Sequence, residues 1–493
     1  MEFEGYYKNM GFEKYPFRDR TAEKEDTRRL FIKPERYSTL LDAFDDKQTC
    51  IINGNRGTGK TIIIEDLKAK IGNKCVMAYI TNFEHIPLSH NILNYYDLIL
   101  QEITRSVLIY LKKNMNKLKR LPKDDKILIS FLIQKYGEAI TDSQLKEQIE
   151  DIQLSKWKMV WNFLSKPITK IFNYGSTVVT NFGVQLLTKS FGMYLPSINS
   201  EEVINIFPEV KFKAVEDFKS VEISYAAFEM ITKRIHDIVG GPVIVFFDKF
   251  DEDHRIENDA DALSEFLKDL LVDNKLLLNE NIQLVIAVWE IAFKVLSKNF
   301  RRSKHFVFDI RWSKDYLIQV LNHRLQVYSE DRIQSLESML DKHDSNKEQI
   351  LELANGNPRD LWDILDNIMQ AQFDIDKNQG RISLQAMNNG MQTFVSGFNF
   401  YEYYPKKKNA RKNTNDVYSY ITFLLYLHED EFTNNEFRDA AGVGGSATNY
   451  ITNMQKIGLI EKTDRKKAGG SIIYKIIDPK IIYAIHNKIE IGH

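Results

Sequence analysis

TCIINGNRGTGKT, at residues 49–61, joins a short apolar run to a glycine-rich loop that ends in lysine and threonine. The apolar run has the length and composition of a buried parallel strand. Gly54, Gly59, Lys60 and Thr61 match the pattern G-x-x-x-x-G-K-[ST], and helical periodicity follows. A strand, this loop and a helix in that order predict a phosphate-binding loop, or P-loop.

The chemistry of phosphate binding explains the spacing of the motif. Glycines let the backbone N–H groups turn inward around phosphates, and the next helix directs its positive end at the same anion. We expect Lys60 to reach the β- and γ-phosphate oxygens and Thr61 to offer its hydroxyl to Mg²⁺. ATP and Mg²⁺ are therefore the predicted ligands. The predicted loop contacts are Gly54, Asn55, Arg56, Gly57, Thr58, Gly59, Lys60 and Thr61.

The composition is that of an ordinary soluble globular protein. A chain of 493 residues is expected to form two to four domains. The net charge of −1 argues neither for nor against a nucleic-acid partner. Cys50 and Cys75 are the two cysteines, and without a C-x-x-C pair they predict neither a disulfide framework nor a zinc site of that kind. We therefore expect a cytoplasmic location.

Two segments bear on membrane targeting. The N-terminal sequence MEFEGYYKNMGFEKY lacks the apolar core of a signal peptide. Residues 171–188 carry no charge and approach spanning length, but they include several Asn, Ser, Thr and Gln side chains. We therefore expect no membrane span, and a buried or partner-facing segment instead.

Short apolar runs alternate with helical periodicity along much of the chain. The predicted strands are 49–53, 75–81, 242–248, 282–289 and 305–310. Strands interleaved with helices predict an α/β fold in which a parallel sheet is covered by helices on both faces.

Acidic residues follow the predicted strand that ends at residue 248. Ligands of parallel sheets bind at the carboxyl ends of strands, so we assign Asp248 to the magnesium shell. The next residue, Lys249, cannot act as a base while protonated. Asp251 or Glu252 must then take the role of catalytic base, or hydrolysis is slow. The alternative is that these acids only end a strand and begin a helix.

The order of these motifs resembles the AAA+ and STAND ATPases, especially their origin-recognition-like initiator branch. The resemblance rests on GNRGTGKT, VIVFFDKFDE, IQLVIAVW, HFVFDI and GNPRDLWDIL, and covers about residues 30–80 and 225–490. In such proteins the segment before the P-loop lies beside the adenine. The resemblance therefore implies that Phe31 and Ile32 contact the base.

Two arginine roles follow from the same resemblance. GNPR (356–359) resembles the sensor 2 motif, which would bring Arg359 from a helical lid onto the γ-phosphate. Arg301 and Arg302 stand where an arginine finger would reach a neighbour's nucleotide, which implies a homo-oligomer. A helix cap and a solvated basic pair are the respective alternatives. Where sensor 1 normally has a small polar residue, this chain has Trp289, which together with Lys249 predicts slow turnover.

The predicted organisation has five parts. They are a lead-in with the first part of the ATPase core (1–100), a large helical insertion (101–222), the second part of the core (223–312), a helical lid (313–404), and a basic linker with a winged-helix domain (405–493). The winged helix is predicted from a helix at 416–428, a short helix ending at Gly442, a helix from about Ser446, and two strands joined by a basic, glycine-tipped wing.

The C-terminal part is moderately basic. Residues 405–493 hold 14 Lys and Arg against 10 Asp and Glu, a net charge of +4. Positive charge in linkers and wings suits contacts with the phosphates of duplex DNA. The candidate contacts are Lys406, Lys407, Lys408, Arg411, Lys412, Asn449, Lys456, Arg465, Lys466 and Lys467. Few of them could read bases, so weak sequence specificity is expected. Docking of a protein remains the alternative.

Two functions follow. In the first, the chain is an ATPase switch that hydrolyses ATP slowly and couples nucleotide state to oligomerisation and to binding of DNA or a partner protein, the latter through the 101–222 insertion. Its resemblance to prokaryotic defence or mobile-element ATPases implies a role such as anti-phage defence. In the second, it is an initiator-like or regulatory DNA-binding protein that uses ATP mainly as a structural ligand.

Overall fold

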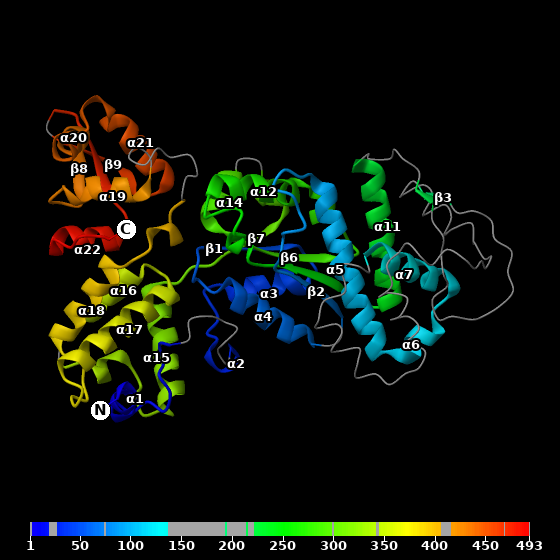
Figure 1. Cartoon of the computed structure of the whole chain (residues 1–493), viewed down its shortest axis with the longest axis horizontal. Coiled ribbons are helices and arrows are strands. Elements are labelled where there is room, and N and C mark those ends of the chain that lie inside the picture. Colours follow the sequence, from blue (N-terminus) through cyan, green and yellow to red (C-terminus); the bar gives the residue numbers. More distant parts are fainter. Residues whose placement is uncertain are drawn as a thin grey trace.

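A five-stranded parallel sheet forms the centre of the molecule (Figure 1). The computed structural model describes residues 2–18, 27–72, 75–136, 193–194, 213–214, 221–297, 300–341, 345–405, 416–467 and 469–492. The strands in spatial order are β2 (Val76–Ile80), β5 (Val243–Phe247), β6 (Gln283–Trp289), β1 (Cys50–Gly54) and β7 (Phe306–Asp309). Each neighbouring pair is parallel. The five predicted strands are confirmed, each to within one residue.

Side chains along each strand point alternately to the two faces of the sheet, and helices cover both faces. In β5, Ile244 and Phe246 join one buried cluster, whereas Val245 and Phe247 join another. This division follows from the period of two in a strand. The first face is covered by α3 (Tyr37–Asp45) and α4 (Lys60–Ile71). The second is covered by α5 (Ile92–Lys113), α11 (Val221–Val239), α12 (Ala260–Val272), α13 (Asn274–Leu277) and α14 (Glu290–Leu296).

Residues of the predicted insertion up to Tyr136 pack on the sheet layer. Helices α6 (Met115–Arg120) and α7 (Lys123–Tyr136) follow α5, and a short antiparallel pair joins β3 (Met193–Tyr194) to β4 (Lys213–Ala214). The Tyr136 hydroxyl donates to Asp97 of α5 across 2.9 Å. The uncharged run 171–188 lies outside the described residues. Among those described, no helix is long and apolar enough to cross a membrane.

A second group of helices lies beside the sheet (Figure 1). We call it the α15–α18 bundle: α15 (Lys314–Ser329), α16 (Ser345–Ala354), α17 (Pro358–Ile375) and α18 (Leu384–Ser396). The N-terminal helix α1 (Phe3–Asn9) packs on it, because Phe3 meets Phe373 edge to face at 5.3 Å between ring centroids. Helix α2 (Thr27–Leu30) leads from there to the sheet layer.

The described residues from 416 to 492, here called the C-terminal segment, combine four helices with a small antiparallel sheet. The helices are α19 (Val417–Leu425), α20 (Asn434–Ala441), α21 (Ala447–Ile457) and α22 (Pro479–Asn487). The strands are β8 (Glu431–Thr433), β9 (Ile460–Lys466) and β10 (Ile472–Ile476), in the order β8-β10-β9. The three helices and two strands expected here are present, while β8 and α22 were not predicted. This segment and the α15–α18 bundle share one continuous hydrophobic core.

Candidate functional site: a phosphate-binding cavity

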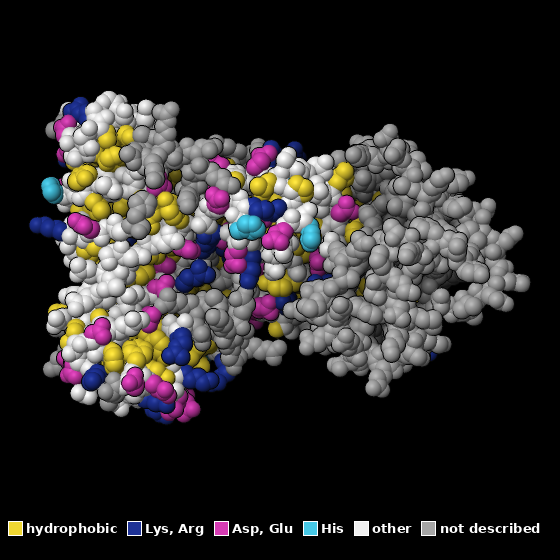
Figure 2. Space-filling model, viewed as in Figure 1, with side chains coloured by type: hydrophobic (Ala, Val, Ile, Leu, Met, Phe, Trp, Pro, Cys, Tyr) yellow, Lys and Arg dark blue, Asp and Glu magenta, His cyan; other side chains and the backbone are white. Residues whose placement is uncertain are grey.

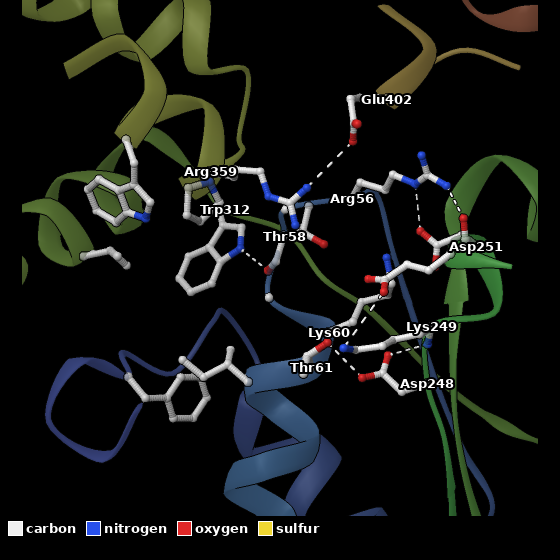
Figure 3. Close-up of a pocket in the computed structure, with 18 of the residues that line it drawn as sticks. Arg56, Thr58, Lys60, Thr61, Asp248, Lys249, Asp251, Trp312, Arg359 and Glu402 are labelled. Atoms are coloured by element: carbon white, nitrogen blue, oxygen red, sulfur yellow. Dashed lines mark hydrogen bonds and ion pairs between the residues drawn. The ribbon is translucent and has the colours of Figure 1, made fainter. Parts of the chain in front are cut away.

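A cavity of about 620 Å³ lies where the sheet meets the α15–α18 bundle. The P-loop forms its floor, the segment after β5 forms one wall, and the bundle forms the opposite wall (Figure 3). The volume is in the range of cavities that enclose small-molecule ligands. Nearly all predicted nucleotide and base-catalysis residues line this one cavity. Those that line it are Phe31, Ile32, Arg56, Gly57, Thr58, Gly59, Lys60, Thr61, Asp248, Asp251, Glu252 and Arg359.

The P-loop wraps around its own lysine. The Lys60 ammonium donates to the carbonyl oxygens of Gly54 and Asn55, each at 3.1 Å. Gly57 and Gly59 have φ angles of +80° and +97°, which glycine adopts at little cost. The helix α4 starts at Lys60, so its first backbone N–H groups point toward the cavity. The loop therefore presents a buried cation and a helix N-terminus to the same space, as an anion requires.

Thr61 and Asp248 meet in the floor of the cavity. The Thr61 hydroxyl donates to a carboxylate oxygen of Asp248 at 2.8 Å, and the hydroxyl of Tyr79 donates to the same oxygen at 3.1 Å. Asp248 is only 1% exposed, and this burial raises the pKa of its carboxyl despite these hydrogen bonds and the charge of Lys60.

The adjacent hydroxyl and carboxylate are hard oxygen ligands of the kind that Mg²⁺ prefers. Among the described residues, no group of three or more His, Cys, Asp or Glu side chains is arranged to hold a metal. Mg²⁺ typically takes one or two protein ligands and completes its shell with water and phosphate oxygens. The pair of Thr61 and Asp248 fits that pattern.

Asp251 is held by an arginine of the P-loop. The Arg56 side chain donates from Nε to the Asp251 carboxylate at 2.9 Å, and also bonds the Asp251 carbonyl oxygen. Burial acts to raise the pKa of Asp251, but the charges of Lys60 and Arg56 outweigh it, so that pKa lies below its usual range. Asp251 is thus engaged and weakly basic, which makes it poorly suited to accept a proton.

Trp289 supports the same arginine. The Arg56 guanidinium lies 5.3 Å from the centroid of the Trp289 ring, a cation–π distance. Gly54 pairs with Trp289 in the register of β1 and β6, so the ring lies beside the start of the P-loop. Sequence reasoning treated Arg56 only as a loop residue and missed this cluster. The one signal was a large aromatic residue at a strand end where a small polar one is usual.

Glu252 has a different environment from Asp251. Its side chain is 64% exposed and lies 3.9 Å from the Lys249 ammonium. Lys249 itself adopts a left-handed φ of 65°, which turns the chain sharply directly after Asp248. Of the two acids predicted as a base, Glu252 is therefore the one that solvent reaches.

Several apolar side chains also line the cavity. Leu30, Phe31 and Ile32 line it from the N-terminal segment, and Trp312, Val320 and Trp362 line it from the bundle side. Aromatic and aliphatic walls suit a flat heterocyclic ring. The Trp312 indole N–H also donates to the Thr58 carbonyl oxygen at 3.0 Å, which ties the bundle to the P-loop. Sequence reasoning did not identify Trp312.

The segment GNPR combines a helix cap with a cavity-lining arginine. Asn357 caps α17, because its side-chain oxygen accepts from the Arg359 N–H at 2.9 Å. The same side chain donates to the Arg56 carbonyl oxygen at 2.7 Å. Arg359 lines the cavity and lies 3.7 Å from Glu402. A Cβ on Gly57 would come within 2.7 Å of Arg359, so α17 approaches the P-loop closely.

The pair Arg301–Arg302 lies outside the residues that line the cavity. Both side chains are exposed before β7, and Arg302 forms an ion pair with Asp309 at 2.7 Å. An arginine finger must lie away from the cavity of its own chain, because it reaches the nucleotide of a neighbouring copy. The ion pair, however, gives Arg302 a partner within its own chain.

The predicted DNA contacts that the structure describes lie on the C-terminal segment. Asn449 and Lys456 are exposed on α21, and Lys466 is exposed on β9. Arg465 pairs with Glu431, and Lys467 pairs with Glu436, which reduces the positive charge of the end of β9 and of the segment that joins it to β10. Basic and acidic side chains are interspersed over the described surface in Figure 2. Lys406, Lys407, Lys408, Arg411 and Lys412 lie outside the described residues.

Comparisons with known proteins do not assign the chain to a family. No family model matches it, and no curated protein matches its sequence. Among solved structures, one described as "Structure of Drosophila ORC bound to DNA" is similar over 98% of this chain and 91% of that chain, with 11% sequence identity and a TM-score of 0.27. A function for the chain must therefore be inferred from its own residues.

Proposed function

We propose that the chain is a P-loop ATPase that binds ATP with Mg²⁺, hydrolyses it slowly, and acts as a nucleotide-dependent switch. One observation carries the proposal: the Thr61 hydroxyl and the buried Asp248 carboxylate meet at 2.8 Å beside the Lys60 ammonium. A hydroxyl, a carboxylate and a lysine at a helix N-terminus are the groups that hold magnesium and the β- and γ-phosphates together.

The sheet order supports the same proposal. Strand β6 lies between β1, which leads into the P-loop, and β5, which is followed directly by Asp248. An extra strand between these two is the arrangement of the additional-strand class of ATPases, to which AAA+ and STAND proteins belong. In this reading the α15–α18 bundle is the lid, which contacts the P-loop through Asn357 and Trp312.

Bound Mg²⁺ would supply positive charge that stabilises the negative charge developing on the phosphate during hydrolysis. The chain's own residues bind and orient the triphosphate: Lys60 pairs with its oxygens, and Arg359 adds a guanidinium from the bundle side. Slow hydrolysis follows from the acids after β5. Lys249 occupies the position beside Asp248, Arg56 holds Asp251, and Glu252 must reach inward from solvent.

We further propose that the C-terminal segment is a winged helix that carries the output, by contacting duplex DNA or a partner protein. The order of helices and strands is that of a winged helix, and α21 is in the position of a recognition helix. ATP-dependent assembly through Arg301 or Arg302 and docking through the 101–222 insertion are part of the same proposal, as is a role in anti-phage defence.

A second candidate function is a DNA-binding regulator that uses ATP mainly as a structural ligand. The engagement of Asp251 by Arg56 favours it, because this acid is then poorly suited to accept a proton from water.

The proposal is tested by measuring ATP binding and hydrolysis of the full chain with Mg²⁺, with and without duplex DNA. We expect tight binding, slow turnover, and loss of binding in Lys60→Ala. A wild-type chain that binds no ATP would contradict the proposal. Binding without any turnover, with DNA present or absent, would instead support the structural-ligand function.

A further inference from the structure

A fully buried cation anchors the C-terminal segment to the α15–α18 bundle. Lys480, in the first turn of α22, has 0% exposure. Its ammonium lies 2.9 Å from a carboxylate oxygen of Asp360, in the first turn of α17, which is 3% exposed. The ammonium also lies 4.5 Å from the ring centroid of Phe398 and 4.8 Å from that of Tyr403.

The polar contacts continue from this ion pair to the P-loop. The Tyr403 hydroxyl interacts electrostatically with the Asp360 carboxylate and accepts a hydrogen bond from the side-chain amide of Asn357. That amide also donates to the carbonyl oxygen of Arg56 in the P-loop, at 2.7 Å. Lys480, Asp360, Tyr403 and Asn357 thus form one buried chain, here called the buried relay, between α22 and the P-loop.

The relay ends at the residue that fixes the start of α17. Asn357 caps this helix through the Arg359 N–H, so one amide side chain touches both the P-loop and the helix that carries Arg359. A shift of the relay would therefore move the P-loop contact and the Arg359 backbone together.

Stability alone is a weak reason for a buried ion pair. Removing two charges from water costs about as much free energy as their attraction returns, and apolar replacements are often as stable. Burial by itself would lower the pKa of Lys480, yet the carboxylates of Asp360 and Asp478 outweigh it and raise that pKa. The contact between two opposite charges favours one orientation of α22 relative to α17, whereas an apolar contact discriminates less between orientations.

We propose that Lys480, Asp360 and Tyr403 are positioning residues for the nucleotide site, so that docking of the C-terminal segment and ATP binding are coupled. The inference rests on the proposed ATP site. Because coupling between two sites is reciprocal, ATP should stabilise the docking of α22 by the same factor by which docked α22 strengthens ATP binding.

Two adjacent tyrosines allow a matched test. Tyr403→Phe removes the hydroxyl that joins Asp360 to Asn357. Tyr404→Phe removes a neighbouring buried hydroxyl that donates to Asp478 at 2.8 Å, and Tyr404 forms no hydrogen bond with Asn357 in the described structure. Both variants keep the ring and lose one hydroxyl, so they should lose similar stability.

ATP affinity is measured by calorimetry on the full chain in the presence of Mg²⁺. We expect Tyr403→Phe to weaken ATP binding about tenfold, as loss of one buried hydrogen bond near a charge would. Tyr404→Phe should stay within about twofold of the wild type. Equal affinities in the two variants, with the wild type binding ATP, would overturn the inference. A wild type that binds no ATP would instead overturn the proposed function.

Hydrogen exchange supplies the reciprocal readout. In the wild type, ATP should slow amide exchange in α22, although this helix does not line the cavity. In Tyr403→Phe that protection should be lost, while in Tyr404→Phe it should remain. Protection of α22 that is the same in all three proteins would show that the relay does not carry the coupling.

Discussion

The hydroxyl of Thr61 donates to the carboxylate of Asp248 at 2.8 Å, although 187 positions separate the two residues in the chain. Parallel pairing explains how they meet, because β1 and β5 run in the same direction and end at the same edge of the sheet. β6 between them sets their separation. This contact is what joins the P-loop to the acidic strand end.

Asp248→Asn should abolish the contribution of Mg²⁺ to ATP binding. The amide keeps the shape of the side chain but removes the negative charge, which is the main attraction for a hard cation. We expect wild-type affinity for ATP to fall at least tenfold when Mg²⁺ is removed with a chelator, and the affinity of the variant to change little. Calorimetric titrations with and without Mg²⁺ measure both.

Tyr79→Phe is the matched control for that change. It also removes a hydrogen bond to Asp248, at 3.1 Å, but leaves the carboxylate in place. Its dependence on Mg²⁺ should resemble that of the wild type. If Tyr79→Phe and Asp248→Asn lost the dependence equally, the assignment of Asp248 to the magnesium shell would fail.

Gly57→Ala should destabilise the protein more than an alanine at another left-handed glycine. A Cβ at position 57 would lie 2.6 Å from the Asn357 side-chain oxygen, so α17 would have to move away from the P-loop. Overpacking of this kind costs about 1–3 kcal/mol in addition to the backbone strain. Gly442 has a φ of +63°, and a Cβ there would meet nothing within 4 Å, so Gly442→Ala carries the strain alone.

Urea unfolding of the two alanine variants separates these costs. The free energy of unfolding of Gly57→Ala should be lower than that of Gly442→Ala by about 1–3 kcal/mol, the cost of overpacking. Equal free energies of unfolding would mean that the α15–α18 bundle does not pack closely against Gly57 of the P-loop.

Local patterns were sufficient to predict the sheet and the floor of the cavity. The P-loop has a fixed spacing, and a strand such as β5 is a continuous apolar run that Asp248 follows directly. Both signals lie within a few neighbouring residues, so no knowledge of tertiary structure was necessary.

The contacts between distant segments could not be predicted in this way. Arg56 meets Asp251 across 195 positions, and Trp312 meets Thr58 across 254. Neither pair has a motif, because each depends on how the loop after β5 and the bundle approach the P-loop. The base assignment was left between Asp251 and Glu252 for the same reason: only the tertiary contact shows that Arg56 holds the first.

Asp251→Asn should lower stability in a way that depends on pH. The variant leaves the Arg56 cation in a largely buried position without its carboxylate, a loss of about 3 kcal/mol near neutral pH. The folded-state pKa of Asp251 lies below its usual range. Its stabilising effect is therefore complete above the unfolded pKa of about 3.9 and is lost as the pH falls through the lower folded value.

Urea unfolding at pH 7 and at successively lower pH measures this difference. The gap between the wild type and Asp251→Asn should be largest at pH 7 and shrink below about pH 4. Asp45→Asn is the control, because Asp45 pairs with Lys70 on the surface at 2.6 Å and is 59% exposed. An exposed pair contributes about 1 kcal/mol or less. A gap for Asp251 as small as that for Asp45 would contradict the structural role of the Arg56 pair.

Glu252→Gln should lower the rate of ATP hydrolysis while leaving ATP affinity nearly unchanged. Glu252 lines the cavity and is reached by solvent, whereas Asp251 is held by Arg56. Loss of a general base typically costs about 10²–10⁴ in rate. Asp251→Asn should instead affect binding and rate together, because it disturbs the P-loop through Arg56. Single-turnover measurements with Glu265→Gln, an exposed acid outside the residues that line the cavity, provide the reference. A Glu252→Gln variant that hydrolyses ATP at the wild-type rate would exclude Glu252 as the base.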